Sequence, residues 1–219
     1  MPPYKNLYFQ ALDENYMELQ RMRSFINLMP GEKRSCVGCH ELRRKAPGSL
    51  GRPLAMDYPA QKLIPQPGDK GPRMVHYASD VQPVLDKHCV GCHGEKNPKG
   101  RLDLTGVPTA QWSRSYQNII GKGLISYADC RYGRANFRPV PPLTHGSHRS
   151  SLVGRIRKDP CKGKLTQAEF IKIVTWIDAN APYYGTYRGK KNLEYKDSPD
   201  FRLPPLDYKK VAMVGKGSK

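Results

Sequence analysis

Two closely similar stretches of the chain decide its fold: "SCVGCHELRRK" at residues 35–45 and "HCVGCHGEKNP" at residues 88–98. Each contains a Cys-x-x-Cys-His run, which is the attachment signature of c-type haem. The two thiols form thioethers with the vinyl groups on one edge of the ring, and the adjacent histidine lies where it can bind the iron. The residues of the two runs are Cys36, Cys39 and His40, and Cys89, Cys92 and His93. We therefore predict two haem c groups, with the two motif histidines as proximal iron ligands.

Two alternative interpretations of the cysteine pairs have less support. A structural zinc site would use all four cysteines, but 49 residues separate the pairs, against about 15–20 in common zinc ribbons. Zinc also gives no reason for a histidine after both pairs. A redox Cys-x-x-Cys motif occurs once, at a helix start within a βαβ unit, and no such unit is visible. Two motifs with histidine, in a chain with only six histidines, favour haem.

The distal iron ligands come from the remaining histidines and methionines. For the second haem we predict His148, with His145 as the alternative, because "THGSHRSSL" leads into a predicted helix that would hold His148 pointing inward. For the first haem we predict His88, which directly precedes the second motif and points toward the neighbouring haem; His76 and Met29 follow as weaker candidates. Two closed irons would only move electrons, whereas an open sixth position would allow a substrate to bind.

The two cysteines outside the motifs, Cys130 and Cys161, are predicted to form a disulfide. Haem c is matured outside the cytoplasm, where disulfides also persist. We therefore expect an extracytoplasmic protein, whether periplasmic, on the cell surface or extracellular. Free thiols or a bond to another subunit are the other readings of this pair. No stretch approaches the roughly 18 apolar residues of a membrane span, and the start "MPPYKNLYFQ" lacks the basic head and apolar run of a signal peptide.

The fold class that we expect is mainly α with much irregular structure, because 20 glycines and 20 prolines are spread over 219 residues. An N-terminal β-hairpin and short helices would pack around the two haems. Residues 1–73 hold the hairpin, the first motif and a Pro/Gly-rich connector. Residues 74–188 form the second haem c domain with a C-terminal helix, and residues 189–219 form an extended basic tail.

The C-terminal helix has the clearest local signals. Thr166 and Glu169 form a capping box at its start, and Asn180 with Pro182 marks its end. Between them lies an apolar stripe at helical spacing, with Trp176 expected at its edge. The stripe consists of Phe170, Ile173, Val174 and Ile177. We also expect short helices at 80–88, 109–121 and 148–158, and a short strand in "RLDLTG" at 101–106.

The net charge of +18 predicts an anionic partner. For a haem protein this indicates acidic redox proteins. A basic zinc protein that binds nucleic acid is disfavoured, because no recognition motif is present and the haem motifs are left unexplained.

Several stretches in order carry a family resemblance: "YFQALDEN", "MPGEKRSCVGCHE", "VQPVLDKHCVGCHG", "GSHRSSLV" and "KLTQAEFIKIVTWIDANAPYYGTY". Together they resemble the C-terminal dihaem region of hydrazine synthase alpha subunit-like proteins over about residues 3–188. The resemblance implies a haem domain built mostly of loops and short helices. It also implies that the second haem is a bis-histidine electron carrier, which matches His93 and His148.

The resemblance departs from the family at the first haem. In hydrazine synthase a tyrosine four residues after the first motif histidine ligates the iron, and that histidine turns to a zinc ion. This chain has Arg44 at the tyrosine position, and a guanidinium that stays protonated is no iron ligand. His40 is therefore expected to be an ordinary proximal ligand.

The function expected from these patterns is electron transfer. The protein would be an extracytoplasmic dihaem cytochrome c without catalytic residues, which passes electrons between its haems and to partners. Self-assembly into an oligomer or filament is a variant of this hypothesis. The alternative is a haem enzyme or enzyme subunit, similar to hydrazine synthase, in which an open first haem acts on a small nitrogen or oxygen species.

Overall fold

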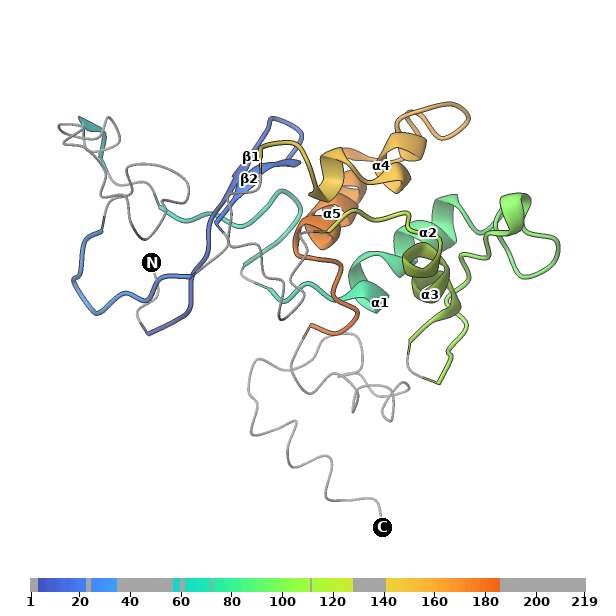
Figure 1. The fold of residues 1–219 in the computed structure, drawn as a ribbon, viewed down its shortest axis with the longest axis horizontal. Coiled ribbons are helices and arrows are strands. Elements are labelled where there is room, and N and C mark those ends of the chain that lie inside the picture. The colour runs from blue at the N-terminus through green and yellow to red at the C-terminus, as the bar shows by residue number, and fades with distance from the viewer. Residues whose placement is uncertain are drawn as a thin grey trace, which may run out of the picture.

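A computed structural model describes residues 4–22, 25–34, 57–59, 62–71, 73–110, 112–127 and 141–185. Within these ranges a small hairpin lies beside a group of short helices, with the last helix, α5, next to the hairpin (Figure 1). No helix among the described residues is long and apolar enough to cross a membrane. The expected fold class, which is mainly α with much irregular structure packed around two haems, stays a prediction.

The hairpin consists of β1 (Gln10–Leu12) and β2 (Glu18–Arg21), which pair antiparallel with a bulge between Ala11 and Leu12. Its turn is closed by Asp13, whose Oδ1 accepts hydrogen bonds from the backbone N–H groups of Asn15 and Met17, both at 2.8 Å. An isolated two-stranded sheet is at best marginally stable in water. The hairpin therefore depends on packing, and Met17 enters the main hydrophobic core at 1% exposure.

The chain reaches the second motif through two short helices, α1 (Tyr77–Asp80) and α2 (Gln82–His88), with Val81 between them. Asp80 is the last residue of α1, and its side chain caps the start of that helix, whereas α2 has Val81 at its N-cap and no side-chain cap. The Asp80 Oδ2 accepts a hydrogen bond from the His76 backbone N–H at 2.7 Å and pairs with Arg73 at 2.7 Å. The bend between the helices turns α2 so that Val84 and Leu85 are buried.

Between α2 and the last helix the structure has the helices α3 and α4 and two 3₁₀ turns. The helix α3 (Arg114–Gly121) begins at the N-cap Ser113. The 3₁₀ turns are η2 (Lys99–Arg101) and η3 (Gly146–His148), and α4 spans Ser151–Ile156. The predicted strand at 101–106 is wrong. This segment is instead hydrogen-bonded to the second Cys-x-x-Cys-His motif, because Leu104 donates its N–H to the His93 carbonyl at 2.7 Å.

The last helix, α5 (Gln167–Asp178), has the predicted capping box of Thr166 and Glu169. Ile173, Val174 and Ile177 of the predicted stripe are buried, and Phe170 is half-buried. Trp176 was expected at the edge but is fully buried, since its Nε1–H finds an acceptor in the Pro182 carbonyl at 2.9 Å. Aromatic rings pack around it. Tyr77 and Tyr116 contact the indole, and Tyr183 contacts both of these tyrosines.

We expect Thr166→Ala to lower the free energy of unfolding by about 1 kcal/mol, because the N-cap hydroxyl is lost from the only long helix in the described part of the chain. Urea denaturation followed by circular dichroism measures this. The neighbouring exposed position supplies the control, since Gln167→Ala should change stability by less than about 0.5 kcal/mol. Equal effects of the two substitutions would show that the capping box contributes nothing specific.

Candidate haem-binding site

The second Cys-x-x-Cys-His motif forms a compact turn directly after α2. The Cys89 N–H still donates to the Leu85 carbonyl at 2.8 Å, so the first cysteine continues the helix. The N–H groups of Cys92 and His93 then both donate to the Cys89 carbonyl, at 3.1 and 2.9 Å. The turn leaves two free thiols, one half-buried at Cys89 and one exposed at Cys92.

His93 is oriented by a backbone acceptor. Its Nδ1 lies 3.1 Å from the Leu102 carbonyl oxygen, and because a carbonyl only accepts, Nδ1 must carry the proton. The lone pair is then on Nε2, which is the arrangement that metal-binding histidines use. Two thiols at this spacing and an imidazole with a free Nε2 fit a haem c group. The motif and the segment around Leu102 would hold it.

The end of α2 is fastened to the start of α5 through Glu169. Its carboxylate accepts from Lys87 Nζ at 2.9 Å and lies 3.1 Å from His88 Nε2, while it also closes the capping box. The hydrogen bond from Lys87 is the main cause that lowers the pKa of Glu169 to about 2. Because His88 directly precedes Cys89, the first cysteine of the second motif, this contact fixes the position of the Cys-x-x-Cys-His turn.

The predicted distal ligands lie in three different environments. His148 is partly exposed, with Nε2 3.2 Å from Asp13 Oδ2. His145 is buried, with Nε2 2.8 Å from Glu18 Oε1. His88 faces Glu169, as described above. None of these contacts tests the assignments, which stay predictions.

His76, a weaker candidate from the sequence, has the most unusual surroundings. It is only 2% exposed, and neither of its ring nitrogens has a hydrogen-bond partner. Burial lowers its pKa, which keeps the imidazole neutral and therefore able to bind a metal. Met29, the other weaker candidate, is 59% exposed.

Several predicted site residues lie outside the described residues. These are Cys36, Cys39, His40, Arg44 and Cys130. Cys161 carries a half-buried free thiol in the structure. The first haem site and the disulfide between Cys130 and Cys161 therefore stay predictions.

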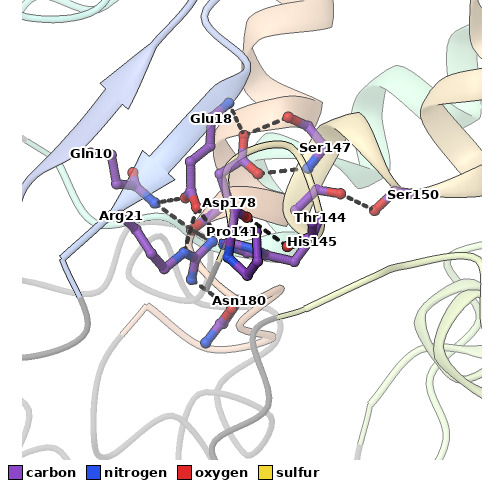
Figure 2. Close-up of polar contacts among 11 residues, drawn as sticks. Gln10, Glu18, Arg21, Pro141, Thr144, His145, Ser147, Ser150, Asp178 and Asn180 are labelled. Atoms are coloured by element: carbon purple, nitrogen blue, oxygen red, sulfur yellow. Dashed lines mark hydrogen bonds and ion pairs between the residues drawn. The ribbon is translucent and has the colours of Figure 1, made fainter. Parts of the chain in front are cut away.

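A buried polar network lies where the hairpin, η3 and the end of α5 meet (Figure 2). Its centre is the Asp178 carboxylate, which is 1% exposed. This group accepts from the Ser147 N–H and Oγ–H, both at 2.7 Å, and from the Glu18 N–H at 3.1 Å. Burial is the main cause that raises the pKa of Asp178. The sequence contains one signal for this role, which is a carboxylate at the end of an apolar helix.

A second layer of the network surrounds Arg21. The Glu18 carboxylate binds the Arg21 Nε at 2.6 Å as well as His145. The Arg21 guanidinium also donates to Asn180 Oδ1 at 2.8 Å and to the Asp178 carbonyl at 2.9 Å. The network thus ties the loop that carries His145 and His148 to the hairpin and to α5. Among the described residues no cluster of three or more His, Cys, Asp or Glu side chains could hold a metal ion.

Gly146 makes this junction sterically feasible. Its φ of +66° lies in the left-handed region, and a Cβ there would overlap the Asp178 carboxylate. The "GSH" at residues 146–148 is therefore a structural element as well as the carrier of a candidate ligand.

Comparisons with known proteins agree with these features only in part. Residues 1–41 match the family model described as hydrazine synthase alpha subunit middle domain. The chain is also 30% identical to hydrazine synthase subunit alpha of Kuenenia stuttgartiensis, in an alignment of 132 residues that covers 51% of this chain and 16% of that protein. No solved structure matches significantly. The chain therefore has a distant relationship to hydrazine synthase alpha subunits, and it corresponds to a small part of the relative's length.

We expect Gly146→Ala to lower the free energy of unfolding by about 2–4 kcal/mol, through backbone strain and displacement of the buried carboxylate. Gly154→Ala is the matched control, since Gly154 lies in α4 with nothing within 4 Å of the added Cβ. That substitution should be neutral or stabilise by about 0.5–1 kcal/mol. Thermal denaturation of the two variants provides the comparison, and a neutral Gly146→Ala would contradict the close approach.

The Glu169 anchor predicts a pH dependence of stability. Because its folded pKa is lowered from 4.5 to about 2, the anchor stabilises the protein above pH 4.5 and loses this effect as the pH falls toward 2. Glu169→Gln should therefore be less stable than the wild type at pH 7, by less than about 1 kcal/mol because the pair is exposed to solvent. The two proteins should converge near pH 2.

Urea denaturation between pH 7 and pH 2 measures this convergence. Lys87→Gln is the companion variant, because it removes the first partner of the carboxylate and should shrink the wild-type pH dependence. A stability difference between wild type and Glu169→Gln that stays constant over this range would rule out the anchor.

Proposed function

We propose that this chain is a haem c-binding, electron-transferring component of an oxidoreductase related to hydrazine synthase. The observation that carries the proposal is the His93 imidazole, held by the Leu102 carbonyl with Nε2 free, next to two unpaired thiols. The distant similarity to a hydrazine synthase alpha subunit supports the same class. Since the chain spans 16% of that relative's length, the activity of the whole relative is not carried over.

The residues of this chain would divide the work as follows. Cys89 and Cys92 attach a haem c group, which supplies one-electron redox chemistry when bound. His93 binds its iron, and the Leu102 carbonyl keeps the ring in the required tautomer and orientation. By the same motif, Cys36, Cys39 and His40 would hold a second group. An extracytoplasmic location and the Cys130–Cys161 disulfide belong to this proposal as well.

The sixth ligand decides between electron transfer and catalysis. His148 is our proposed distal ligand for the second haem, since its Nε2 has no hydrogen-bond partner among the described residues and lies 3.2 Å from Asp13 at the partly exposed hairpin turn. His76 competes with it, because it is buried and both of its ring nitrogens lack partners. For the first haem, His88 would have to leave Glu169 before it could bind iron.

A self-contained electron carrier is the second candidate function. Arg44 favours it, because that residue replaces the iron-binding tyrosine implied by the family resemblance and leaves His40 as an ordinary ligand. The enzyme-subunit reading instead requires an open first haem that binds a small nitrogen or oxygen species.

Low-temperature EPR of the oxidised protein, with optical spectra of the reduced protein before and after carbon monoxide, tests these functions. We expect two low-spin haem signals and no response to carbon monoxide, as two closed irons require. A high-spin signal that responds to carbon monoxide would overturn the carrier reading and identify an open, substrate-binding haem. Absence of covalently bound haem would overturn the proposal as a whole.

Ligand-exchange variants identify the distal residue. We expect His148→Met to convert one low-spin bis-histidine signal into a histidine–methionine signal and to raise the potential of that haem. The parallel variants His76→Met and His88→Met should leave the signal of the second haem unchanged. If His76→Met alone changes it, His76 is the ligand and the assignment to His148 is wrong.

A further inference from the structure

The segment between α4 and α5 is strongly basic and exposed. Residues 155–164, here called the basic loop, contain five cationic side chains and one carboxylate, Asp159. All five cations are exposed. They are Arg155, Arg157, Lys158, Lys162 and Lys164.

These cations are not neutralised within the described part of the chain. Arg157 contacts the Met17 sulfur at 3.7 Å, and no carboxylate pairs with any of the five. By contrast, Arg21, Arg34, Arg73 and Arg114 each bind a carboxylate at 3.1 Å or less. The basic loop therefore concentrates five positive charges, without a paired carboxylate among the described residues, within ten positions of the chain.

The loop is also an ordered support for these charges. Successive turns are closed by backbone hydrogen bonds, from Lys158 N–H to the Arg155 carbonyl at 3.2 Å and from Cys161 N–H to the Lys158 carbonyl at 2.9 Å. Lys164 N–H then donates to the Cys161 carbonyl at 3.1 Å. The cations are thus displayed on a defined surface.

The basic loop lies beside the haem-attachment turn. It ends two residues before Thr166, which shares a capping box with Glu169, and Glu169 contacts His88 next to Cys89. Lys87 at the end of α2 is paired with Glu169 at 2.9 Å, so it is not counted among the uncompensated charges.

We infer that the basic loop forms the docking surface for the acidic face of a redox protein, placed so that electrons would pass to or from a haem held at the turn of Cys89. This inference rests on the proposed function, since it requires a haem at that turn. Complementary charge speeds encounter and fixes orientation more than it adds affinity. The transfer itself moves one electron from the reduced protein to an oxidised partner, with no bond made or broken.

Two charge-reversal variants test the location. The first reverses Lys158, Lys162 and Lys164 to glutamate; the matched control reverses Lys5, Lys70 and Lys122, which are also exposed and lie elsewhere in the chain. Both variants change the net charge equally, so any difference between them reports position. The probe is hexacyanoferrate(III), a small anion that accepts one electron from the reduced holoprotein.

At low ionic strength we expect the loop variant to be oxidised at least about tenfold more slowly than the wild type, and the control less than about threefold more slowly. The rates should converge as salt screens the charges. Equal slowing in both variants would overturn the inference while leaving the proposed function intact. Absence of bound haem in the wild type would instead overturn the proposed function.

A binding measurement gives a readout independent of electron transfer. Hexacyanochromate(III), a redox-inert paramagnetic anion, should broaden the backbone NMR signals of residues 155–164 in the reduced holoprotein. In the loop variant this broadening should be lost, and in the control variant it should persist. Broadening centred on any other surface would overturn the inference.

Discussion

A buried carboxylate at the end of the one long described helix sets the arrangement of the protein. Asp178 is 1% exposed, and a carboxylate in that position is stable only when donors surround it. Those donors come from Ser147 of η3 and from the Glu18 backbone of β2. Removal of one donor from such a buried group typically costs about 1–3 kcal/mol. The need to surround the Asp178 carboxylate with donors therefore holds the hairpin and the loop that carries His145 and His148 against α5. Apolar packing alone would not impose this arrangement.

The same helix also positions the haem-attachment turn. Its C-terminal end carries Asp178, and its N-terminal end carries Glu169, which contacts Lys87 and His88 just before the motif. Between these ends Ile173, Val174 and Ile177 form part of the core. The helix α5 thus connects the loop that carries His145 and His148 with the turn that carries His93, so these two segments are held in a fixed relation although the described part of the chain has little regular structure.

Features that depend on neighbouring residues in the sequence were predictable, and features that depend on distant contacts were not. The Cys-x-x-Cys-His turn and the capping box of Thr166 and Glu169 follow from local chemistry, and the capping box is confirmed. The strand expected at 101–106 fails because those residues bond to His93 rather than to another strand. Trp176 was placed at the edge because nothing in the sequence pairs its indole N–H with the Pro182 carbonyl. The network around Asp178 joins residues about 160 positions apart, from Glu18 to Asp178, which no local pattern encodes.

The remaining histidines differ in what their surroundings already satisfy. His145 is bound to Glu18 within the structural network, so its recruitment to an iron would disrupt the junction that holds its own loop. His148 Nε2 lies 3.2 Å from Asp13 Oδ2 but has no hydrogen-bond partner among the described residues, so a change of partner there costs little. The ring nitrogens of His76 have no hydrogen-bond partner among the described residues although the residue is buried, and such an unpaired group costs about 1–3 kcal/mol. A protein can keep such a destabilising group when the group gains a bonding partner in the functional state. An imidazole kept neutral by burial binds metals well, so His76 and His148 are the two residues between which the assignment of the distal ligand must be decided.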